Sequence, residues 1–271
     1  MKRSKSLLIS GGIIALAMTF FTTPSRAQSF DGEFGFFDHV GAGVSLGTDG
    51  IGIDVAAPLT DWGAVRAGIS FMPAIKYTKK DVEIDDPAVY PKVDIDGKLN
   101  IFDFKILADF YPFQTSSFHV TAGAFIGSST AVKAENAGPF FKDKDTGIRV
   151  GDYAITCDDN GDVHADVKVN SFKPYIGIGF GRAIPKKNRV SVSFDFGVKF
   201  WGTPGVGVET TKPWGTFGRD NLSYHKFTYD EVKTPRTGEA DYMKDVRDAL
   251  EIANKIIVYP VLNVRLTGRI F

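Results

Sequence analysis

The chain has 271 residues, and its 32 Lys and Arg residues equal its 32 Asp and Glu residues, so the formal net charge at neutral pH is zero. This balance gives no electrostatic reason to expect a nucleic-acid partner. Glycine and aromatic residues are abundant and there is one cysteine, which excludes a disulfide framework within the chain and favours closely packed strands. Cys157 is predicted to be a loop thiol without a redox role, because no CxxC motif accompanies it.

The N-terminal segment has the features of a targeting sequence. Lys2, Arg3 and Lys5 precede an apolar stretch over residues 7–21, and small residues stand before Ala27. We therefore predict a signal peptide over residues 1–27, cleaved near Ala27, followed by one domain over residues 28–271. Beyond Ala27 no run of 18 apolar residues occurs, so a chain exported in this way is expected to be either soluble or a membrane barrel made of strands.

Eight segments alternate between apolar residues and small or polar residues with a period of two, which is typical of strands. In chain order they are residues 39–47, 51–57, 63–77, 93–111, 118–131, 167–182, 190–201 and 257–271. The alternation is clearest at 190–200, where Val190, Val192 and Phe194 oppose Ser191, Ser193 and Asp195. Phe125 interrupts the alternation of the fifth segment.

The connections between these segments differ in length. Those after the second, fourth and sixth strands are short, whereas those after the third, fifth and seventh are polar and longer, at residues 85–91, 133–166 and 202–254. Short turns on one side and long loops on the other are expected of an outer-membrane barrel. Within the last loop, residues 239–254 have an apolar stripe at helical spacing, which predicts a helix packed on the barrel rim or a neighbouring loop; a cofactor or partner groove is the alternative.

The two faces of the predicted strands differ in charge. The apolar face is nearly free of charged residues, whereas the opposite face carries Asp54, Arg66, Asp103, Lys105, Asp109, Asp195, Lys199, Arg265 and Arg269. A bilayer requires a closed barrel with an apolar outer face, and eight strands enclose an interior that side chains fill. We predict that these nine residues lie in the lumen as structural ion pairs, without a large pore.

A soluble barrel would have the opposite polarity, and alternation alone does not say which face is inside. The export signal, the polar loops and the aromatic residues near strand ends favour the membrane interpretation. Those aromatic residues are Trp62, Tyr77, Tyr111, Trp201 and Tyr259.

The final strand ends at Phe271 and resembles the assembly signal of bacterial outer-membrane barrels. The segments GVSLGTDGIGIDVAAPLTDWGAVRAGISFMP, DFKILADFYPFQTSSFHVTAGAFIG and PYIGIGFGRAIPKKNRVSVSFDFGVKFWG resemble small outer-membrane β-barrel proteins of Bacteroidota, most of them uncharacterised. The resemblance implies an all-β fold, an eight-stranded antiparallel transmembrane β-barrel with long external loops and one short loop helix. It also implies a place in the outer membrane, with membrane lipid and the barrel-assembly machinery as partners, but no active site.

The sequence contains no recognisable catalytic or metal-binding pattern. Ser117 and His119 share a strand face beside a short turn, while His39, His164 and His225 show neither HExxH nor other tight metal-ligand spacing. We expect no enzymatic activity, metal or cofactor. The leading hypothesis is an integral outer-membrane protein with a structural or surface-interaction role, whose loops contact an extracellular ligand. The alternatives are a carrier or channel for small apolar solutes, and an outer-leaflet lipid-modifying enzyme.

Overall fold

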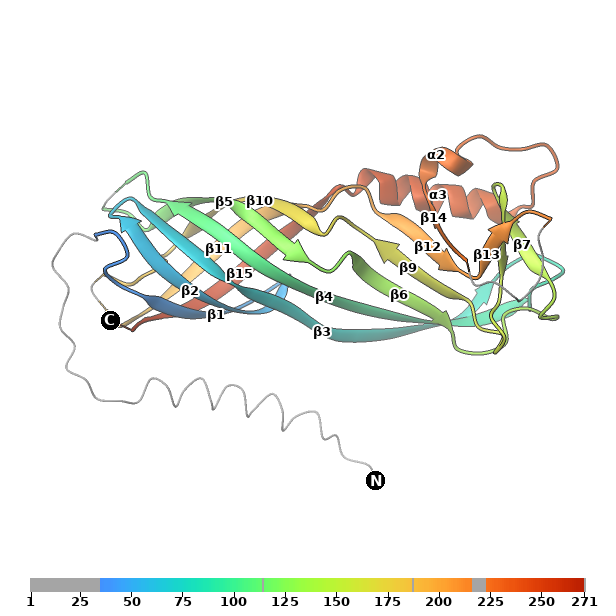
Figure 1. Cartoon of the computed structure of the whole chain (residues 1–271), viewed down its shortest axis with the longest axis horizontal. Helices are drawn as coiled ribbons and strands as arrows, with labels where there is room; N and C mark the ends of the chain where they lie inside the picture. The colour runs from blue at the N-terminus through green and yellow to red at the C-terminus, as the bar shows by residue number, and fades with distance from the viewer. Residues whose placement is uncertain (1–34, 114, 187, 216–222, 271) are drawn as a thin grey trace, which may run out of the picture.

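The computed structural model describes residues 35–113, 115–186, 188–215 and 223–270. The predicted signal peptide and the assembly signal at Phe271 lie outside the described residues. The molecule is elongated, with a barrel at one end and a second folded unit, here called the external body, at the other (Figure 1).

Eight strands form a closed antiparallel ring in the order β1-β2-β3-β4-β5-β10-β11-β15, and β15 pairs back with β1. Their bounds are β1 Gly41–Gly47, β2 Gly50–Thr60, β3 Gly63–Glu83, β4 Lys92–Phe110, β5 Phe118–Gly127, β10 Phe172–Phe180, β11 Val190–Phe200 and β15 Val258–Arg269. Each strand overlaps one of the eight predicted segments. The predicted eight-stranded antiparallel barrel is therefore confirmed.

Two predicted strands are each divided in the structure. The segment 118–131 breaks after β5 and continues as β6 (Thr130–Asn136), and the segment 167–182 contains the end of β9 (His164–Lys168) before β10 begins. At the break, the Val169 amide donates to the Ser129 carbonyl and the Gly127 amide donates to the Ser171 carbonyl. The chain leaves the barrel here, because β6 and β9 pair with each other outside the ring.

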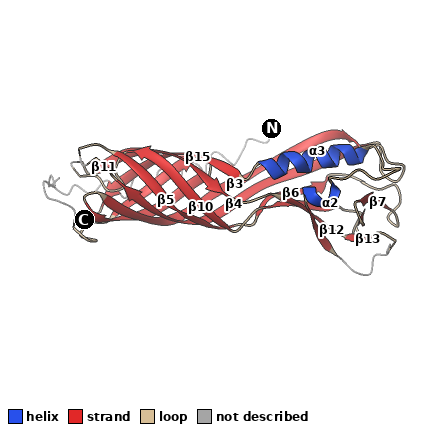
Figure 2. Ribbon diagram, turned by 90° about the horizontal axis from the view of Figure 1, so that it is seen from above, coloured by secondary structure: helices blue, strands red, loops and turns tan. Residues whose placement is uncertain are grey.

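The external body is built on the long hairpin of β3 and β4, which runs continuously from the barrel into it (Figure 2). The far half of β4 pairs with β6, and the sheet continues through β9, β12 (Gly205–Glu209) and β14 (Tyr224–Phe227). A second sheet consists of β7 (Gly147–Val150), β8 (Tyr153–Thr156) and β13 (Thr211–Pro213). Two helices, α2 (Tyr229–Val232) and α3 (Tyr242–Lys255), complete this body.

The connections over residues 133–166 and 202–254 are long, as predicted, but they form strands and two helices where irregular loops and a single helix were expected. These segments enclose an apolar core, whose buried residues include Val89, Phe140, Phe141, Val150, Val208, Phe227, Met243 and Leu250. Strands of four or five residues contain too few alternations to be recognised by period.

Helix α3 lies close to its predicted position and buries Met243 and Leu250 in this core. It therefore packs on the external sheet. Cys157 follows β8 directly and is also buried in this core, where its Sγ lies 3.6 Å from the Lys144 carbonyl oxygen. The prediction of a loop thiol placed it correctly along the chain but did not foresee its burial.

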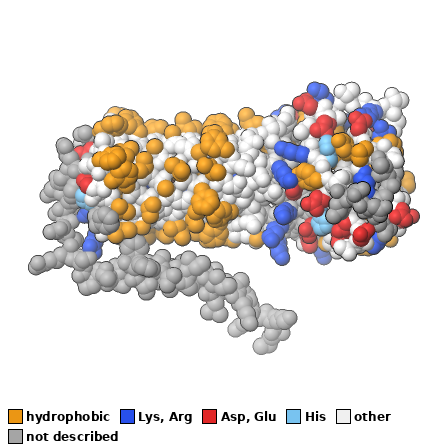
Figure 3. All heavy atoms as spheres, viewed as in Figure 1, with side chains coloured by type: hydrophobic (Ala, Val, Ile, Leu, Met, Phe, Trp, Pro, Cys, Tyr) orange, Lys and Arg blue, Asp and Glu red, His pale blue; other side chains and the backbone are white. Residues whose placement is uncertain are grey.

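The barrel has an apolar outside and a charged inside. On β11, the Phe194 side chain is 57% exposed and the next residue, Asp195, is 7% exposed. Figure 3 shows the apolar side chains spread over the barrel surface, while charged side chains gather on the external body.

Among the described residues, no helix has the length and apolarity needed to cross a membrane.

Candidate functional site

The part of the barrel interior farthest from the external body is organised around Arg66 of β3. Its guanidinium lies 2.7 Å from Asp109 Oδ1 and 3.1 Å from Asp195 Oδ1. The Thr121 hydroxyl donates to Asp109 at 2.7 Å, and His119 Nε2 lies 2.9 Å from Asp195 Oδ1. All five side chains are buried, so these charges are compensated by one another rather than by bulk water.

A second cluster is centred on Asp54 of β2. Arg265 donates to Asp54 through Nε at 2.8 Å and also through Nη2, and Lys105 Nζ lies 3.2 Å from Asp54 Oδ2. Lys105 Nζ is also 3.4 Å from the Ser45 hydroxyl oxygen. Strands β1, β2, β4 and β15 each contribute one side chain to this cluster, which ties opposite sides of the ring together.

A third cluster lies nearer the external body. Asp103 of β4 is fully buried and lies 2.6 Å from Lys173 Nζ and 3.2 Å from Lys199 Nζ. The Lys199 ammonium also lies 4.5 Å from the centroid of the Phe125 ring, a cation–π contact. One carboxylate therefore forms ion pairs with two buried lysines.

An apolar layer fills the space between these clusters. It consists of Leu107, Phe125, Tyr175 and Val261, all buried, with the two rings 5.4 Å apart. A cavity bordered by this layer and by Arg66 measures about 10 Å³, which is room for about one water molecule. Phe125, which interrupts the alternation of apolar residues in its segment, is part of this apolar layer. The interior of the barrel is packed.

The end of the barrel opposite the external body is closed by the connection between β10 and β11. Ala183 and Ile184 of this connection are buried against Ala56, Ala64 and Tyr111. The Ala183 amide donates to the Tyr111 hydroxyl oxygen at 2.8 Å, and the Arg182 guanidinium lies 4.7 Å from the Tyr111 ring centroid. Tyr111 was counted among the aromatic residues near strand ends that favour the membrane interpretation. It lies inside instead, because it seals this end of the barrel.

Glycines on the inward faces leave room for the long polar side chains. A Cβ atom at Gly43 would lie 2.6 Å from Arg265 Nε, and one at Gly177 or Gly197 would lie 2.5 Å from the Tyr175 hydroxyl oxygen. The absence of a side chain at these positions therefore permits the close approach.

Eight of the nine residues predicted to face the lumen lie in these three clusters, and the ninth does not. The eight are Asp54, Arg66, Asp103, Lys105, Asp109, Asp195, Lys199 and Arg265. Arg269 lies at the barrel edge, half-buried, where Nη1 donates to the carbonyls of Pro185 (3.3 Å) and Lys186 (3.1 Å).

Sequence reasoning missed three buried ionisable residues. Lys173 could have been found by extending the alternation of the sixth segment backwards from Ile176, and His119 was placed on the inward face of its strand but not in the ion-pair set. Asp49 lies in the turn between β1 and β2, where no alternation exists. Among the described residues the buried acids are Asp49, Asp54, Asp103, Asp109 and Asp195, and the buried bases are Arg66, Lys105, Lys173, Lys199 and Arg265. With five of each, the buried charges balance.

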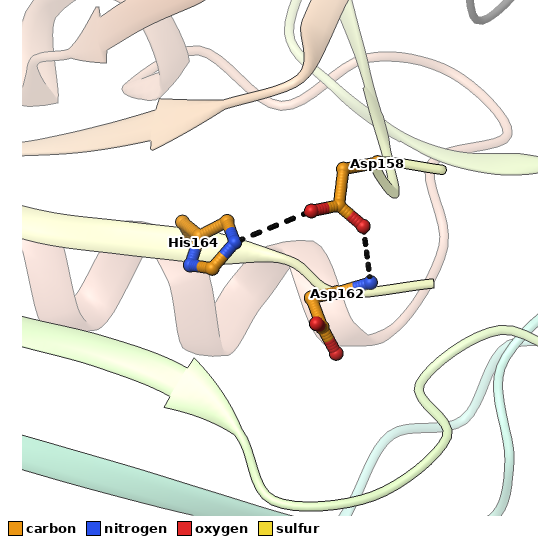
Figure 4. Close-up of side chains that lie close together, drawn as sticks. All are labelled: Asp158, Asp162 and His164. Carbon is orange, nitrogen blue, oxygen red and sulfur yellow. Dashed lines mark hydrogen bonds and ion pairs between the residues drawn. The ribbon is translucent and has the colours of Figure 1, made fainter. Parts of the chain in front are cut away.

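The described residues of the external body include a group of potential metal ligands, in the turn between β8 and β9 (Figure 4). Ligand atoms of Asp158, Asp162 and His164 all lie within 4.8 Å of one another. The sequence had shown no metal motif at His164. Asp158 Oδ1 accepts hydrogen bonds from the amides of Asn160 and Asp162 at 2.9 Å, and Asp158 Oδ2 lies 3.5 Å from His164 Nε2. The carboxylate thus also stabilises the turn itself.

This turn is expected to weaken only in acid. Burial raises the pKa of Asp158, but hydrogen bonds from the Asp162 and Asn160 amides and from His164 outweigh it and lower the pKa below its ordinary value of 3.8. A lowered pKa stabilises the fold above the ordinary value, and that contribution is lost as the pH falls through the lowered pKa. An NMR titration should show the amide shifts of Asn160 and Asp162 moving with a midpoint below 3.8. Asp158→Asn should abolish that titration, and a midpoint above 3.8 would contradict the expected direction.

A closed ring of strands with an apolar outer face and a charged, packed interior defines the class of transmembrane β-barrels, since a water-soluble barrel has the opposite polarity. The outer membrane is the bacterial membrane in which such barrels reside.

A scan against protein-family models and a search of curated proteins each found no match. Among solved structures, the crystal structure of Acinetobacter baumannii CarO2 has a TM-score of 0.47 at 17% identity, covering 88% of this chain and 100% of that chain. The crystal structure of A. baumannii CarO has a TM-score of 0.43 at 18% identity, covering 84% and 96%. The class given above rests on the ring of strands and on its polarity.

Proposed function

We propose that this chain is an integral outer-membrane protein whose packed barrel anchors the external body at the cell surface, in a surface-interaction or envelope-integrity role. It is neither an enzyme nor a large pore. The observation that carries the proposal is the combination of a filled, charge-balanced interior with an external body that has its own apolar core. The barrel serves as a membrane anchor, and the body is the part available to partners.

The external body offers a recognition surface. An open cavity of about 250 Å³ lies between the second sheet and the helices, and its lining includes Arg149, Trp214, Arg236, Tyr242 and Met243. The Arg149 guanidinium lies 5.0 Å from the Trp214 ring centroid. Aromatic and arginine side chains at an open site are the residues that dominate binding energy at protein interfaces, which supports a role in contact with an extracellular ligand.

The two alternative functions have less support. A carrier for apolar solutes needs an apolar cavity, and the space in the interior is about 10 Å³ and bordered by charged residues. A lipid-modifying enzyme needs an accessible histidine, but His119 is buried between Asp195 (2.9 Å) and the Ser117 carbonyl oxygen (3.3 Å).

Reconstituted wild-type protein is expected to show no stable, porin-sized conductance in planar bilayers. Phe125→Ala combined with Tyr175→Ala removes both rings of the apolar layer and should produce a small conductance, because side chains alone fill a barrel of this size. Phe104→Ala, on the lipid-facing side of β4, is the matched control and should show no conductance. A stable large conductance of the wild type would overturn the proposal.

Location is tested separately from conductance. After fractionation of cells, the protein is expected in the outer membrane, with a gel mobility that changes on heating, and the external body should be cleaved by protease added to intact cells. A periplasmic protein whose mobility does not change on heating would refute the membrane anchor.

A further inference from the structure

Three lysines lie side by side on the outward face of neighbouring strands. Lys76 of β3 is directly opposite Lys98 of β4, and Lys98 is directly opposite Lys133 of β6. All three side chains are exposed. These three residues are here called the lysine row. Like charges placed directly opposite each other destabilise a sheet, so a bound anion would stabilise the lysine row.

The chain itself does not supply that anion. In the described residues none of the three lysines forms an ion pair, although Asp166 of β9 lies directly opposite Lys133 and Asp96 and Glu135 lie two residues along the strands from Lys98 and Lys133. Asp166 lies 3.5 Å from Lys168 Nζ, and Glu135 lies 3.4 Å from His164. Asp96 accepts a hydrogen bond from the Thr78 hydroxyl at 2.5 Å and is not within ion-pair distance of Lys76 or Lys98.

The position of the lysine row coincides with the end of the apolar band. On β4, Lys98 shares its outward direction with Phe102 and Phe104, which are exposed, and it lies four residues, or about 13 Å, beyond Phe102 along the strand. Figure 3 shows Lys and Arg side chains gathered where the apolar surface gives way to the external body. This is the level at which the head groups of the surrounding leaflet begin.

An open cavity adjoins the row. It measures about 350 Å³ and is lined by Lys98, Lys133, Asn100, Ser128, Ser129, Thr130 and Ala131. The lining offers two ammonium groups together with hydroxyl and amide donors, and no carboxylate. Ammonium groups beside small donors are suited to the oxygens of a phosphate.

We infer that the lysine row and its cavity bind the phosphate of a phosphorylated glycolipid in the outer leaflet. The inference rests on the proposed membrane location. A lipid phosphate at this height would relieve the repulsion among the three ammonium groups, while its acyl chains would lie against Phe102 and Phe104. Basic groups at a membrane surface attract anionic lipid, so the row favours a doubly or singly phosphorylated head group over an unphosphorylated one.

The test measures binding of purified diphosphoryl lipid A, its monophosphoryl form and its dephosphorylated form to the full-length protein in nanodiscs of zwitterionic phosphatidylcholine, by native mass spectrometry. Wild-type protein should retain the diphosphoryl form most and the dephosphorylated form least. Lys76→Gln, Lys98→Gln and Lys133→Gln combined should weaken retention of the diphosphoryl form about tenfold or more. The control triple Lys79→Gln, Lys80→Gln and Lys244→Gln removes the same charge from exposed lysines of the external body and should bind as the wild type does.

Each outcome has a defined meaning. Equal loss in both triple variants, or no preference for phosphorylated lipid, would overturn the inference while leaving the membrane barrel intact. Displacement of the lipid by inorganic phosphate at the same phosphorus concentration would also overturn it, since the site would then be one for free phosphate. Failure of the wild type to enter nanodiscs at all would instead refute the proposed function.

Discussion

Replacing Phe196 by lysine is expected to destabilise the barrel in a bilayer by about 2–4 kcal/mol, the effect of a basic residue on the lipid-facing surface near the midplane. Phe196 is 53% exposed, and its cross-strand partners Ile178 and Leu262 are exposed as well. The substitution therefore places a charge in the middle of the apolar band. In a water-soluble protein the same change at a half-exposed phenylalanine would be neutral or would increase solubility, so the sign of the effect distinguishes the two environments.

The measurement is equilibrium unfolding by urea in phosphatidylcholine vesicles, with heat-modifiable gel mobility as the sign of a folded barrel. Ile252→Lys provides the control, because Ile252 is 61% exposed on α3 in the external body and should tolerate the charge. If Phe196→Lys folded with unchanged stability and Ile252→Lys behaved identically, the apolar band would not be in contact with lipid.

The barrel strands were predictable because apolar residues alternate with polar or small ones over seven or more residues in each, the pattern expected of a strand with one face toward lipid. Between Val190 and Phe200 each apolar residue faces outward and each polar or small residue faces inward, so the polarity of the site followed from the strand pattern alone. The same alternation places Lys173 on the inward face of β10. Lys173 was left out of the predicted lumen residues because the alternation was followed only from Ile176 onward.

The external body was not predictable in this way. Its contacts join segments far apart in the chain, such as the reciprocal hydrogen bonds between Thr156 and Thr210, 54 residues apart. Its strands are short, and Val208 of β12 and Phe227 of β14 are buried in one core with Met243 and Leu250 of α3, a contact that local periodicity does not contain.

The clusters inside the barrel were predictable as a set but not as pairs. That Arg66 contacts Asp195, 129 residues away, depends on the closure and tilt of the ring. The packed layer around Phe125 and the seal formed by Tyr111 and Ile184 are likewise products of closure, since these residues gather only when both edges of the sheet meet.

Asp103→Asn is expected to destabilise the barrel strongly. Asp103 is the only carboxylate within 4.0 Å of Lys173 and Lys199 among the described residues, at 2.6 Å and 3.2 Å. Removing its charge leaves two buried ammonium groups uncompensated, and breaking a buried ion pair in this way costs about 3–5 kcal/mol. Urea unfolding in vesicles should show that loss, whereas Asp96→Asn, on the same strand but exposed in the external body, should change stability by less than about 1 kcal/mol.

The companion experiment removes the whole cluster. Asp103→Leu combined with Lys173→Met and Lys199→Met exchanges three buried charges for apolar side chains of similar length, and Met at position 199 keeps contact with the Phe125 ring. Because a buried cluster replaced as a unit leaves no charge unpaired, this triple variant should recover most of the stability lost in Asp103→Asn. Recovery would establish that the charges compensate one another structurally. A triple variant that folds stably but acquires conductance would assign the cluster a role in blocking solute passage instead, and Asp103→Asn with wild-type stability would show that the two lysines do not depend on this carboxylate.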